Sequence, residues 1–251
     1  MDDHHFLVVG GTRGTGRALV QRLLDTAGYR VSVFGRHHEP ADGAPRLASY
    51  QVDVTDTAAL RSALDMAVAK DGKFHSVVFM QRNRAEQDEF EADLAVALTA
   101  TKNAIEHLVA QAYFSRAYST NSIVMVSSIA DHYVAPEQDV GYHVSKAGLA
   151  HLARYYALTL GGLGIRVNSV SPCVVIKESA REFYSKNGWL TDRFERFIPL
   201  GRAGNSEDIV NVISFLISEQ SSYVTGQNIV VDGGLTLRSH ESIIRDFARG
   251  E

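Results

Sequence analysis

A short apolar run that leads into a glycine-rich loop and then into a helical pattern constrains the fold of this chain most. Residues 6–9 are all apolar, as expected of a strand buried on both faces of a sheet. The loop that follows is Gly10-Gly11-Thr12-Arg13-Gly14-Thr15-Gly16, and apolar residues then recur at helical spacing until Gly28. A strand, a tight glycine turn and a helix in this order predict the first βα junction of a parallel sheet.

A glycine loop at this junction is typical of a dinucleotide site. Glycines let the backbone approach a pyrophosphate, and the N–H groups at the helix start favour its negative charge. The alternative is a tight turn that needs positive φ. We take Gly10, Thr12, Arg13, Gly14, Thr15 and Gly16 as candidate cofactor-binding residues.

Strand and helix patterns alternate along the rest of the chain. The strand patterns cover residues 30–34, 48–52, 77–79, 122–126, 165–170 and 228–231, and the helical ones cover 57–70, 86–111, 142–160 and 207–218. Such alternation implies right-handed crossovers and a parallel sheet covered on both faces. With no repeat, linker or low-complexity segment, residues 1–251 are predicted to form one α/β domain, a Rossmann-type doubly wound parallel sheet with helices on both faces.

Composition narrows the class of protein. A length of 251 residues with 45% hydrophobic content suffices for one core, and a net charge of −4 gives no reason to expect nucleic acid or an anionic membrane as a partner. The single Cys173 excludes an intrachain disulfide, and no apolar run approaches the roughly 20 residues that span a bilayer. The ten histidines show no metal-ligand pattern, so we expect no bound metal. Because the chain has a single cysteine and no membrane-spanning run, we expect a cytoplasmic protein.

The end of the second strand bears on the choice of cofactor. A free ribose 2′-hydroxyl is usually met there by Asp or Glu, whereas a 2′-phosphate favours a cation. This chain offers Arg36, with Arg13 in the glycine loop, which favours NADP(H), although either could be a solvated surface arginine. After the third strand, Asp53, followed by Val54, could reach an adenine amino group.

Tyr142 and Lys146 lie four residues apart at the start of the predicted helix 142–160, so both side chains lie on one helix face. The ammonium would favour phenolate, and each unit by which the tyrosine pKa falls from about 10 takes about 1.4 kcal/mol. Such a tyrosine can exchange a proton with a carbonyl or alcohol oxygen. The alternative is an ordinary pair on a solvated helix face.

Several motifs occur together in one order. They are Gly10-x-x-x-Gly14-x-Gly16, Ser127-Ser128, Tyr142-x-x-x-Lys146, the segment 166–172, the segment 198–204, Thr225-Gly226-Gln227 and Asp232-Gly233-Gly234. With them, the chain closely resembles the short-chain dehydrogenase/reductase family, which includes 3-oxoacyl-carrier-protein reductases. The likeness extends from Val8 to Gly234.

The resemblance implies roles for matching residues. Tyr142 would be the general acid that protonates a carbonyl oxygen, Lys146 would lower its pKa and hold the nicotinamide ribose, and Ser128 would donate a hydrogen bond to the same oxygen. Pro172 and Val175 are expected at the cofactor. The substrate would be a small or carrier-bound carbonyl compound, and the family likeness suggests a homodimer or homotetramer built through helices 86–111 and 142–160.

Three positions depart from the family pattern. Met80-Gln81-Arg82-Asn83 replaces Asn-Asn-Ala-Gly, which alters the wall beside the adenosine ribose. Ala97 replaces the asparagine that would hold a proton-relaying water, and Lys177 replaces a threonine and could bind an acidic substrate. Arg84 follows the first of these segments without an assigned role.

Three further segments carry weaker expectations. The loop between Ser128 and Tyr142 is one residue longer than usual, which brings His132, Tyr133 and Glu137 near the predicted pocket; a packed loop histidine is favoured over one that binds substrate. Residues 174–200 are a candidate substrate lid, the alternative being a helical pair on the surface. In the tail, residues 235–251, Ile243, Ile244 and Phe247 have helical spacing that could dock on this subunit or on a neighbour.

The first hypothesis is therefore NADPH-dependent reduction of a carbonyl to an alcohol, or the reverse oxidation, by Ser128, Tyr142 and Lys146. A second is an NADP(H)-binding protein with weak or no reductase activity and a sensor or assembly role, which Ala97 and the altered segment 80–83 favour. A third is an epimerase or dehydratase of the same fold.

Overall fold

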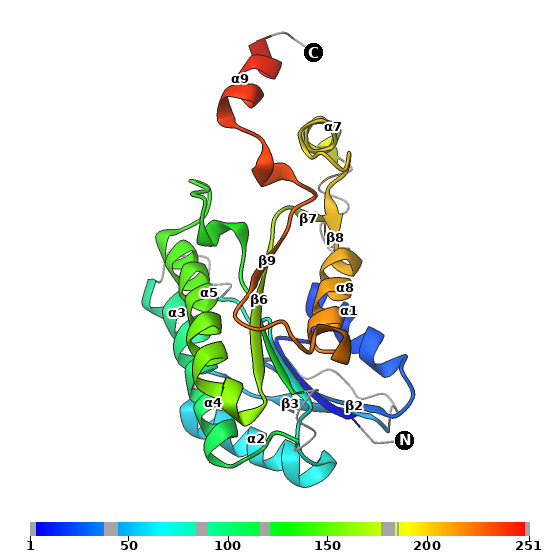
Figure 1. Ribbon diagram of the computed structural model, residues 1–251, viewed down its shortest axis with the longest axis vertical. Coiled ribbons are helices and arrows are strands. Elements are labelled where there is room, and N and C mark those ends of the chain that lie inside the picture. Colours follow the sequence, from blue (N-terminus) through cyan, green and yellow to red (C-terminus); the bar gives the residue numbers. More distant parts are fainter. Residues whose placement is uncertain are drawn as a thin grey trace.

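The computed structural model describes residues 4–37, 45–83, 90–115, 121–176, 184 and 186–248. Seven parallel strands form its central sheet (Figure 1): β1 (His4–Val9), β2 (Tyr29–Gly35), β3 (Leu47–Gln51), β4 (Ser76–Phe79), β5 (Ser122–Val126), β6 (Arg166–Pro172) and β9 (Asn228–Val231). Their order is β3-β2-β1-β4-β5-β6-β9, so the winding direction changes between β1 and β4. The predicted doubly wound parallel sheet is confirmed.

Helices cover both faces of this sheet (Figure 1). They are α1 (Gly14–Leu24), α2 (Thr57–Asp71), α3 (Phe90–Leu94), α4 (Ala100–Ala110), α5 (Val140–Leu160), α7 (Gly188–Phe197), α8 (Ser206–Leu216) and α9 (His240–Ala248). The stretch predicted as one helix over residues 86–111 is interrupted, because a π-helical turn, η1 (Ala95–Thr99), joins α3 to α4. Residues 86–89 lie outside the described part.

Alternating side chains of β1 fill two separate cores. Leu7 and Val9 pack in the core that α2, α4 and α5 cover, whereas Phe6 and Val8 pack in the core on the side of α1 and α8. All four are at most 2% exposed. Because successive strand residues point to opposite faces, burial on both sides requires the continuous apolar run that the sequence shows.

The C-terminal tail packs on the segment predicted as a lid. A two-stranded sheet, β7 (Val175–Ile176) with β8 (Gly204–Asn205), lies at the base of this segment and was not predicted. The rings of Phe197 in α7 and Phe247 in α9 are 4.9 Å apart, and an Arg196 guanidinium N–H donates to the Asp246 carbonyl over 3.2 Å. The tail therefore docks on its own chain, at one end of the molecule (Figure 1).

The described part of this lid segment is α7 with its flanks. Phe183 and Lys177 lie outside the described residues. A lid function for residues 174–200 stays a prediction. Within the ranges given above, no helix combines the length and the apolar character needed to cross a membrane.

Candidate active site

The glycine loop forms one wall of a cleft at the switch point, where ligands of open parallel sheets bind. Gly10 has φ 83° and lies so close to the segment after β4 that a Cβ would be 2.7 Å from the Gln81 nitrogen. A Cβ on Gly16 would be 2.3 Å from the Gly10 carbonyl oxygen. Side chains are excluded at both positions, so the backbone and the start of α1 at Gly14 form a cradle that fits a pyrophosphate.

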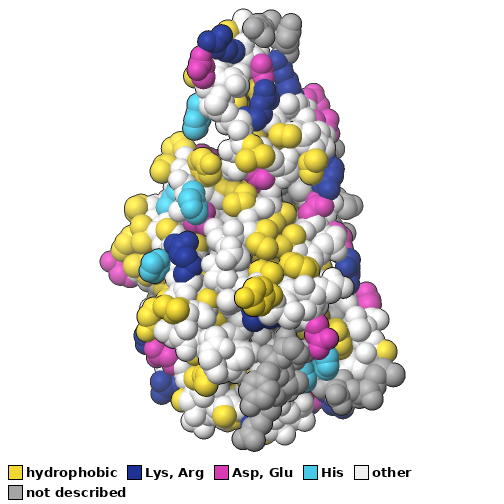
Figure 2. All heavy atoms as spheres, in the orientation of Figure 1, with side chains coloured by type: hydrophobic (Ala, Val, Ile, Leu, Met, Phe, Trp, Pro, Cys, Tyr) yellow, Lys and Arg dark blue, Asp and Glu magenta, His cyan; other side chains and the backbone are white. Residues whose placement is uncertain are grey.

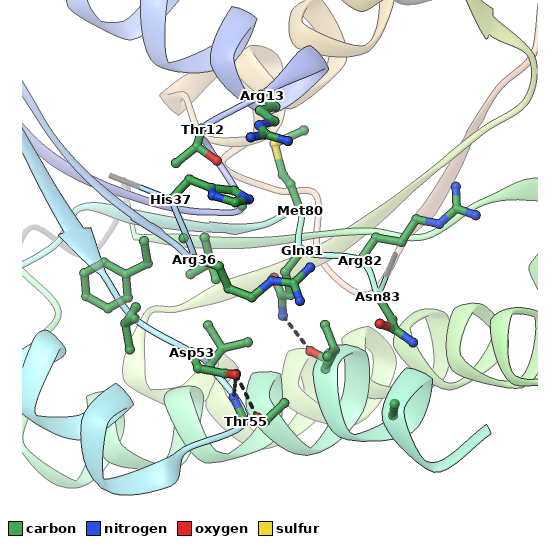
Figure 3. Close-up of a pocket in the computed structure, with 18 residues that line it drawn as sticks. Thr12, Arg13, Arg36, His37, Asp53, Thr55, Met80, Gln81, Arg82 and Asn83 are labelled. Atoms are coloured by element: carbon green, nitrogen blue, oxygen red, sulfur yellow. Dashed lines mark hydrogen bonds between the residues drawn. The ribbon is translucent and has the colours of Figure 1, made fainter. Parts of the chain in front are cut away.

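The first part of the cleft is a cavity of about 300 Å³ (Figure 3). It is lined by Val9, Gly10, Thr12, Arg13, Phe34, Gly35, Arg36, His37, Val52, Asp53, Val54, Thr55, Met80, Gln81, Arg82, Asn83, Ala92 and Val96. Arg13, Arg36 and Arg82 outnumber the single carboxylate, Asp53, among these lining residues. The cavity therefore favours an anionic ligand.

Asp53 is held as a carboxylate at the exit of β3. Its Oδ1 accepts from the Thr55 backbone N–H over 3.0 Å and from the Thr55 hydroxyl over 2.7 Å. These bonds, and more weakly the charge of Arg36, lower the pKa of Asp53. A charged acceptor therefore stands in the cavity that Arg36 also lines (Figure 3).

The second part of the cleft is a cavity of about 220 Å³. Its lining is Gly10, Arg13, Thr15, Gly16, Met80, Arg82, Val126, Ser127, Ser128, Tyr142, Lys146, Pro172, Cys173, Val175 and Ile209. Four residues, namely Gly10, Arg13, Met80 and Arg82, line both cavities, so the two form one continuous cleft. The structure thus brings Ser128, Tyr142 and Lys146 together beside the glycine loop.

Lys146 is held firmly beside Tyr142. Its side chain is 5% exposed, and Nζ lies 5.6 Å from the centre of the Tyr142 ring. Nζ also donates to the Val126 carbonyl over 3.0 Å, and the Ser127 hydroxyl donates to the Lys146 carbonyl over 2.8 Å. These bonds tie α5 to the end of β5, so a buried ammonium faces the phenol from a defined direction.

Ser128 begins a short turn, η2 (Ile129–Asp131), at the end of β5. Its Oγ accepts from the Ala130 N–H over 3.2 Å, so its own hydrogen can be donated into the cavity. The turn is anchored by Asp131, whose Oδ2 accepts from the Ser171 hydroxyl and from the Asn228 amide, each over 2.7 Å. Bonds to β6 and β9 therefore fix the position of Ser128.

The longer loop after this turn is fastened by a histidine that the sequence did not single out. His143 Nε2 accepts from the Ala135 N–H, and its Nδ1 donates to the Asp139 carbonyl, each over 2.9 Å. His132, by contrast, is 61% exposed and pairs with Asp131 over 2.6 Å. His132, Tyr133 and Glu137 are absent from the lining of both cavities.

Arg82 takes a position that the sequence did not predict. The segment 80–83, expected beside the adenosine ribose, does line the first cavity, whereas the Arg82 side chain extends away from Arg36 and Asp53 (Figure 3). Its Cζ lies 4.6 Å from the centre of the Tyr142 ring, and a guanidinium N–H donates to Gln138 Oε1 over 3.1 Å. The only signal in the sequence was an arginine where related proteins have alanine.

Ala97 lies in η1, behind the cleft, and is 4% exposed. Gln81 Nε2 donates to the Val96 carbonyl over 3.3 Å and to the Thr101 hydroxyl over 2.8 Å, which holds η1 against the end of β4. On its other side η1 presses on α5, where Gly148 leaves room for Leu98. Position 97 is therefore enclosed by protein.

The other residues singled out in the sequence lie in several places. Thr12, Arg36, Asp53 and Val54 line the first cavity, and Thr15, Pro172 and Val175 line the second. Gly14 lines neither cavity, but starts α1 with φ 54°. Arg84 and Lys177 lie outside the described residues. Within the described ranges, no group of three or more His, Cys, Asp or Glu is arranged to hold a metal ion.

Comparisons with known proteins point to one family. Residues 10–236 match the family model described as enoyl-(acyl carrier protein) reductase. A 3-oxoacyl-(acyl-carrier-protein) reductase from Thermotoga maritima is 33% identical over 212 residues, which cover 78% of this chain and 80% of that protein. Human (3R)-3-hydroxyacyl-CoA dehydrogenase is 32% identical over 252 residues, which cover 91% of this chain and 94% of that protein. A short-chain type dehydrogenase/reductase from Mycobacterium ulcerans superposes with a TM-score of 0.82 at 25% identity, covering 98% of this chain and 95% of that one.

Proposed function

Because the chain belongs to the short-chain dehydrogenase/reductase family, whose members are NAD(P)(H)-dependent oxidoreductases, we propose that it reduces a carbonyl to an alcohol with NADPH, or catalyses the reverse oxidation. One observation carries the proposal: Ser128, Tyr142 and Lys146 line one cavity together with Gly10 and Gly16. The substrate is a small or carrier-bound carbonyl compound.

Each of the three residues has a task that its surroundings support. Tyr142 gives its proton to the carbonyl oxygen, or takes it back in the oxidative direction. Lys146, with Nζ held by the Val126 carbonyl, stabilises the phenolate that remains. Ser128 donates its hydroxyl hydrogen to the same oxygen, where negative charge develops. The nicotinamide cofactor supplies the hydride when it is bound.

The cofactor is held by the first cavity and the glycine loop. Gly10, Gly14 and Gly16 cradle the pyrophosphate, Arg13 and Arg36 bind the 2′-phosphate, and Asp53 faces the adenine. The other residues that contact the cofactor are Thr12, Thr15, Val54, Pro172 and Val175. An observation that favours a phosphate is the tight packing at Gly35, where a Cβ would be 2.9 Å from Thr12 Cγ2. A side chain at position 35 would therefore have to displace Thr12, and the residue that follows is Arg36.

A second candidate function is NADP(H) binding with weak or no reductase activity. Its support is Ala97, which is buried and has no polar group to hold a relay water beside Lys146. In that case the cleft would bind the dinucleotide without resupplying the tyrosine proton, and the protein would act as a sensor or an assembly partner.

The quaternary structure proposed is a homodimer or homotetramer formed through α5. The helix exposes Val140, Val144, Tyr155 and Leu158, the last at 85%, and their spacings of four, eleven and three residues place them on one helix face. Hydrophobic side chains also gather on the molecular face seen in Figure 2. A large apolar stripe on a helix surface is typical of a protein interface.

NADPH oxidation with a panel of ketones tests the reductase proposal. Wild type should consume NADPH, and Tyr142→Phe should do so about 100-fold more slowly or worse, the usual scale of a lost general acid. NADPH binding to both proteins is measured in parallel by fluorescence. Equal rates for the two proteins across the panel, with NADPH bound to both, would overturn the proposal in favour of the second candidate.

A further inference from the structure

Arg82 is not one of the three proposed catalytic residues and is not part of the glycine cradle, yet it lines both cavities. Its backbone is held in place on two sides. Gly10 lies directly against Gln81, and the Gln81 side chain is bonded to the Val96 carbonyl and the Thr101 hydroxyl. The base of the Arg82 side chain is therefore set by the fold, at the end of β4.

The Arg82 guanidinium is also directed by its contacts. It lies over the Tyr142 ring, with Cζ 4.6 Å from the ring centre, and one N–H is bonded to Gln138 Oε1. Gln138 is itself held, because its backbone N–H donates to the Ala135 carbonyl over 2.9 Å. A guanidinium carries five N–H donors in one plane, so stacking and one bond leave donors along its edge.

The charge around this group favours an anion. Of the described residues that line the second cavity, Arg13, Arg82 and Lys146 are cationic and none is acidic. Arg13 is part of the glycine loop, and the buried Nζ of Lys146 is directed at the Val126 carbonyl. Arg82 is exposed and points away from Arg36 and Asp53 (Figure 3). It is therefore the cation best placed to meet a substrate beside the Tyr142 phenol.

We propose that Arg82 determines specificity by binding a carboxylate of the substrate, so that the preferred substrates are oxo acids with the carboxylate a few bonds from the reacting carbonyl. The proposal rests on the proposed reductase function and names its substrate class. A guanidinium binds a carboxylate through two parallel N–H bonds, which would orient the carbonyl toward Tyr142. The other source of an anionic oxygen at this place is the cofactor, and the experiment separates the two.

The test compares pyruvate, acetoacetate and levulinate, each with its methyl ester, which keeps the carbonyl and removes the charge. Wild type should show a kcat/KM at least about 10-fold higher for one acid than for its ester, the scale of a charge-assisted hydrogen bond. Arg82→Ala should lower kcat/KM for that acid by about 10- to 100-fold more than it lowers kcat/KM for the ester. Arg82→Lys should recover part of the lost kcat/KM for the acid, because lysine keeps the positive charge but cannot form two parallel N–H bonds to a carboxylate. Arg61→Ala, at an exposed site on α2, is the control.

Binding measurements keep the test independent of turnover. Saturation-transfer NMR on the protein loaded with NADP+ should show that wild type binds the acid more tightly than the ester, and that Arg82→Ala loses this difference. If no ketone is turned over but the acid is still preferred in binding, the reductase function fails and the Arg82 site stands. Equal losses for acid and ester, no binding of any of the acids, or a matching loss of NADPH affinity in Arg82→Ala would each overturn the site.

Discussion

The ammonium of Lys146 lies 5.6 Å from the centre of the Tyr142 ring, one helical turn further along α5, with its Nζ bonded to the Val126 carbonyl. Helical spacing alone would permit both side chains to point into solvent. The bond to the end of β5 instead directs the lysine inward, where it is 5% exposed. The pair is thus an oriented unit of a half-buried phenol and a buried ammonium beside Ser128 in the cavity.

Replacing Lys146 tests whether this orientation serves catalysis. Lys146→Met should lower kcat by about 100-fold or more, because no cation remains to stabilise the phenolate. Lys146→Arg should recover only part of the rate, since a planar guanidinium does not fit a site shaped around a compact ammonium. Steady-state NADPH oxidation measures both variants. Full activity in Lys146→Arg would show that the enclosed geometry is unimportant.

Arg36 should determine the preference for NADPH. Arg36→Ala is expected to weaken NADPH binding by about 1–3 kcal/mol, the scale of a charge-assisted contact, and to leave NADH nearly unchanged because NADH has no 2′-phosphate. Fluorescence titration with the two cofactors gives both affinities. Equal losses for NADPH and NADH would remove the 2′-phosphate assignment.

Ala97→Asn should raise turnover if the missing water relay limits the rate. An asparagine at this buried position in η1 would supply the amide that the family likeness expects to hold the relay water. Ala97→Val is the matched control, because it adds bulk without an amide. A rate that stays flat or falls in Ala97→Asn, compared under single-turnover and steady-state conditions, would count against the relay idea.

His5 should make stability depend on pH. The ring is 1% exposed, and burial lowers the pKa of His5 from 6.5, although a 2.7 Å bond to the Gly72 carbonyl opposes the shift. Between the folded pKa and 6.5 the unfolded chain therefore binds more protons than the folded one. The free energy of unfolding should accordingly fall as the pH drops below 6.5 and be retained above it.

Urea unfolding at about pH 7.5 and about pH 5.5 measures this effect. His5→Asn should lose less stability between the two pH values than wild type, whatever its stability at the higher pH. The exposed His151, replaced by Asn, is the control and should behave like wild type. The same pH dependence in His5→Asn and wild type would assign the titration to another group.

The apolar stripe on α5 should hold the oligomer together. Leu158→Glu is expected to convert a dimer or tetramer to smaller species, because a charge would have to be buried at the interface. Leu237→Glu, at a site 86% exposed against 85% for Leu158, should not change the assembly. Light scattering after size exclusion gives the mass. A monomeric wild type would contradict the proposed assembly.

Features that depend on local periodicity were predictable. The apolar run over residues 6–9, the glycine loop and the alternation of strands with helices led to the observed sheet, because burial on both faces of a parallel strand leaves a direct mark on the sequence. The shared face of Tyr142 and Lys146 followed from helix geometry in the same way.

Features that depend on packing between distant segments were not predictable. The π-helical turn at Ala95–Thr99 lies between α5, which it meets at Gly148, and the segment after β4, where Gln81 bonds to Val96. The docking of α9 on α7 depends on the contact between Phe197 and Phe247. The loop between Ser128 and Tyr142 is held by the hydrogen bond between Ala135 and His143. Neither partner of these contacts carries a local signal for the other.

Arg82 shows this division most clearly. The sequence by itself determined that an arginine follows β4, that the chain forms a doubly wound sheet and that Tyr142 and Lys146 share a helix face, since each of these is a matter of neighbouring residues. Only the tertiary structure decided that the guanidinium lies over the Tyr142 ring rather than beside Arg36. The direction of a long side chain is set by what surrounds it, and here Gln138 and the phenol ring come from a part of the chain that only folding brings near.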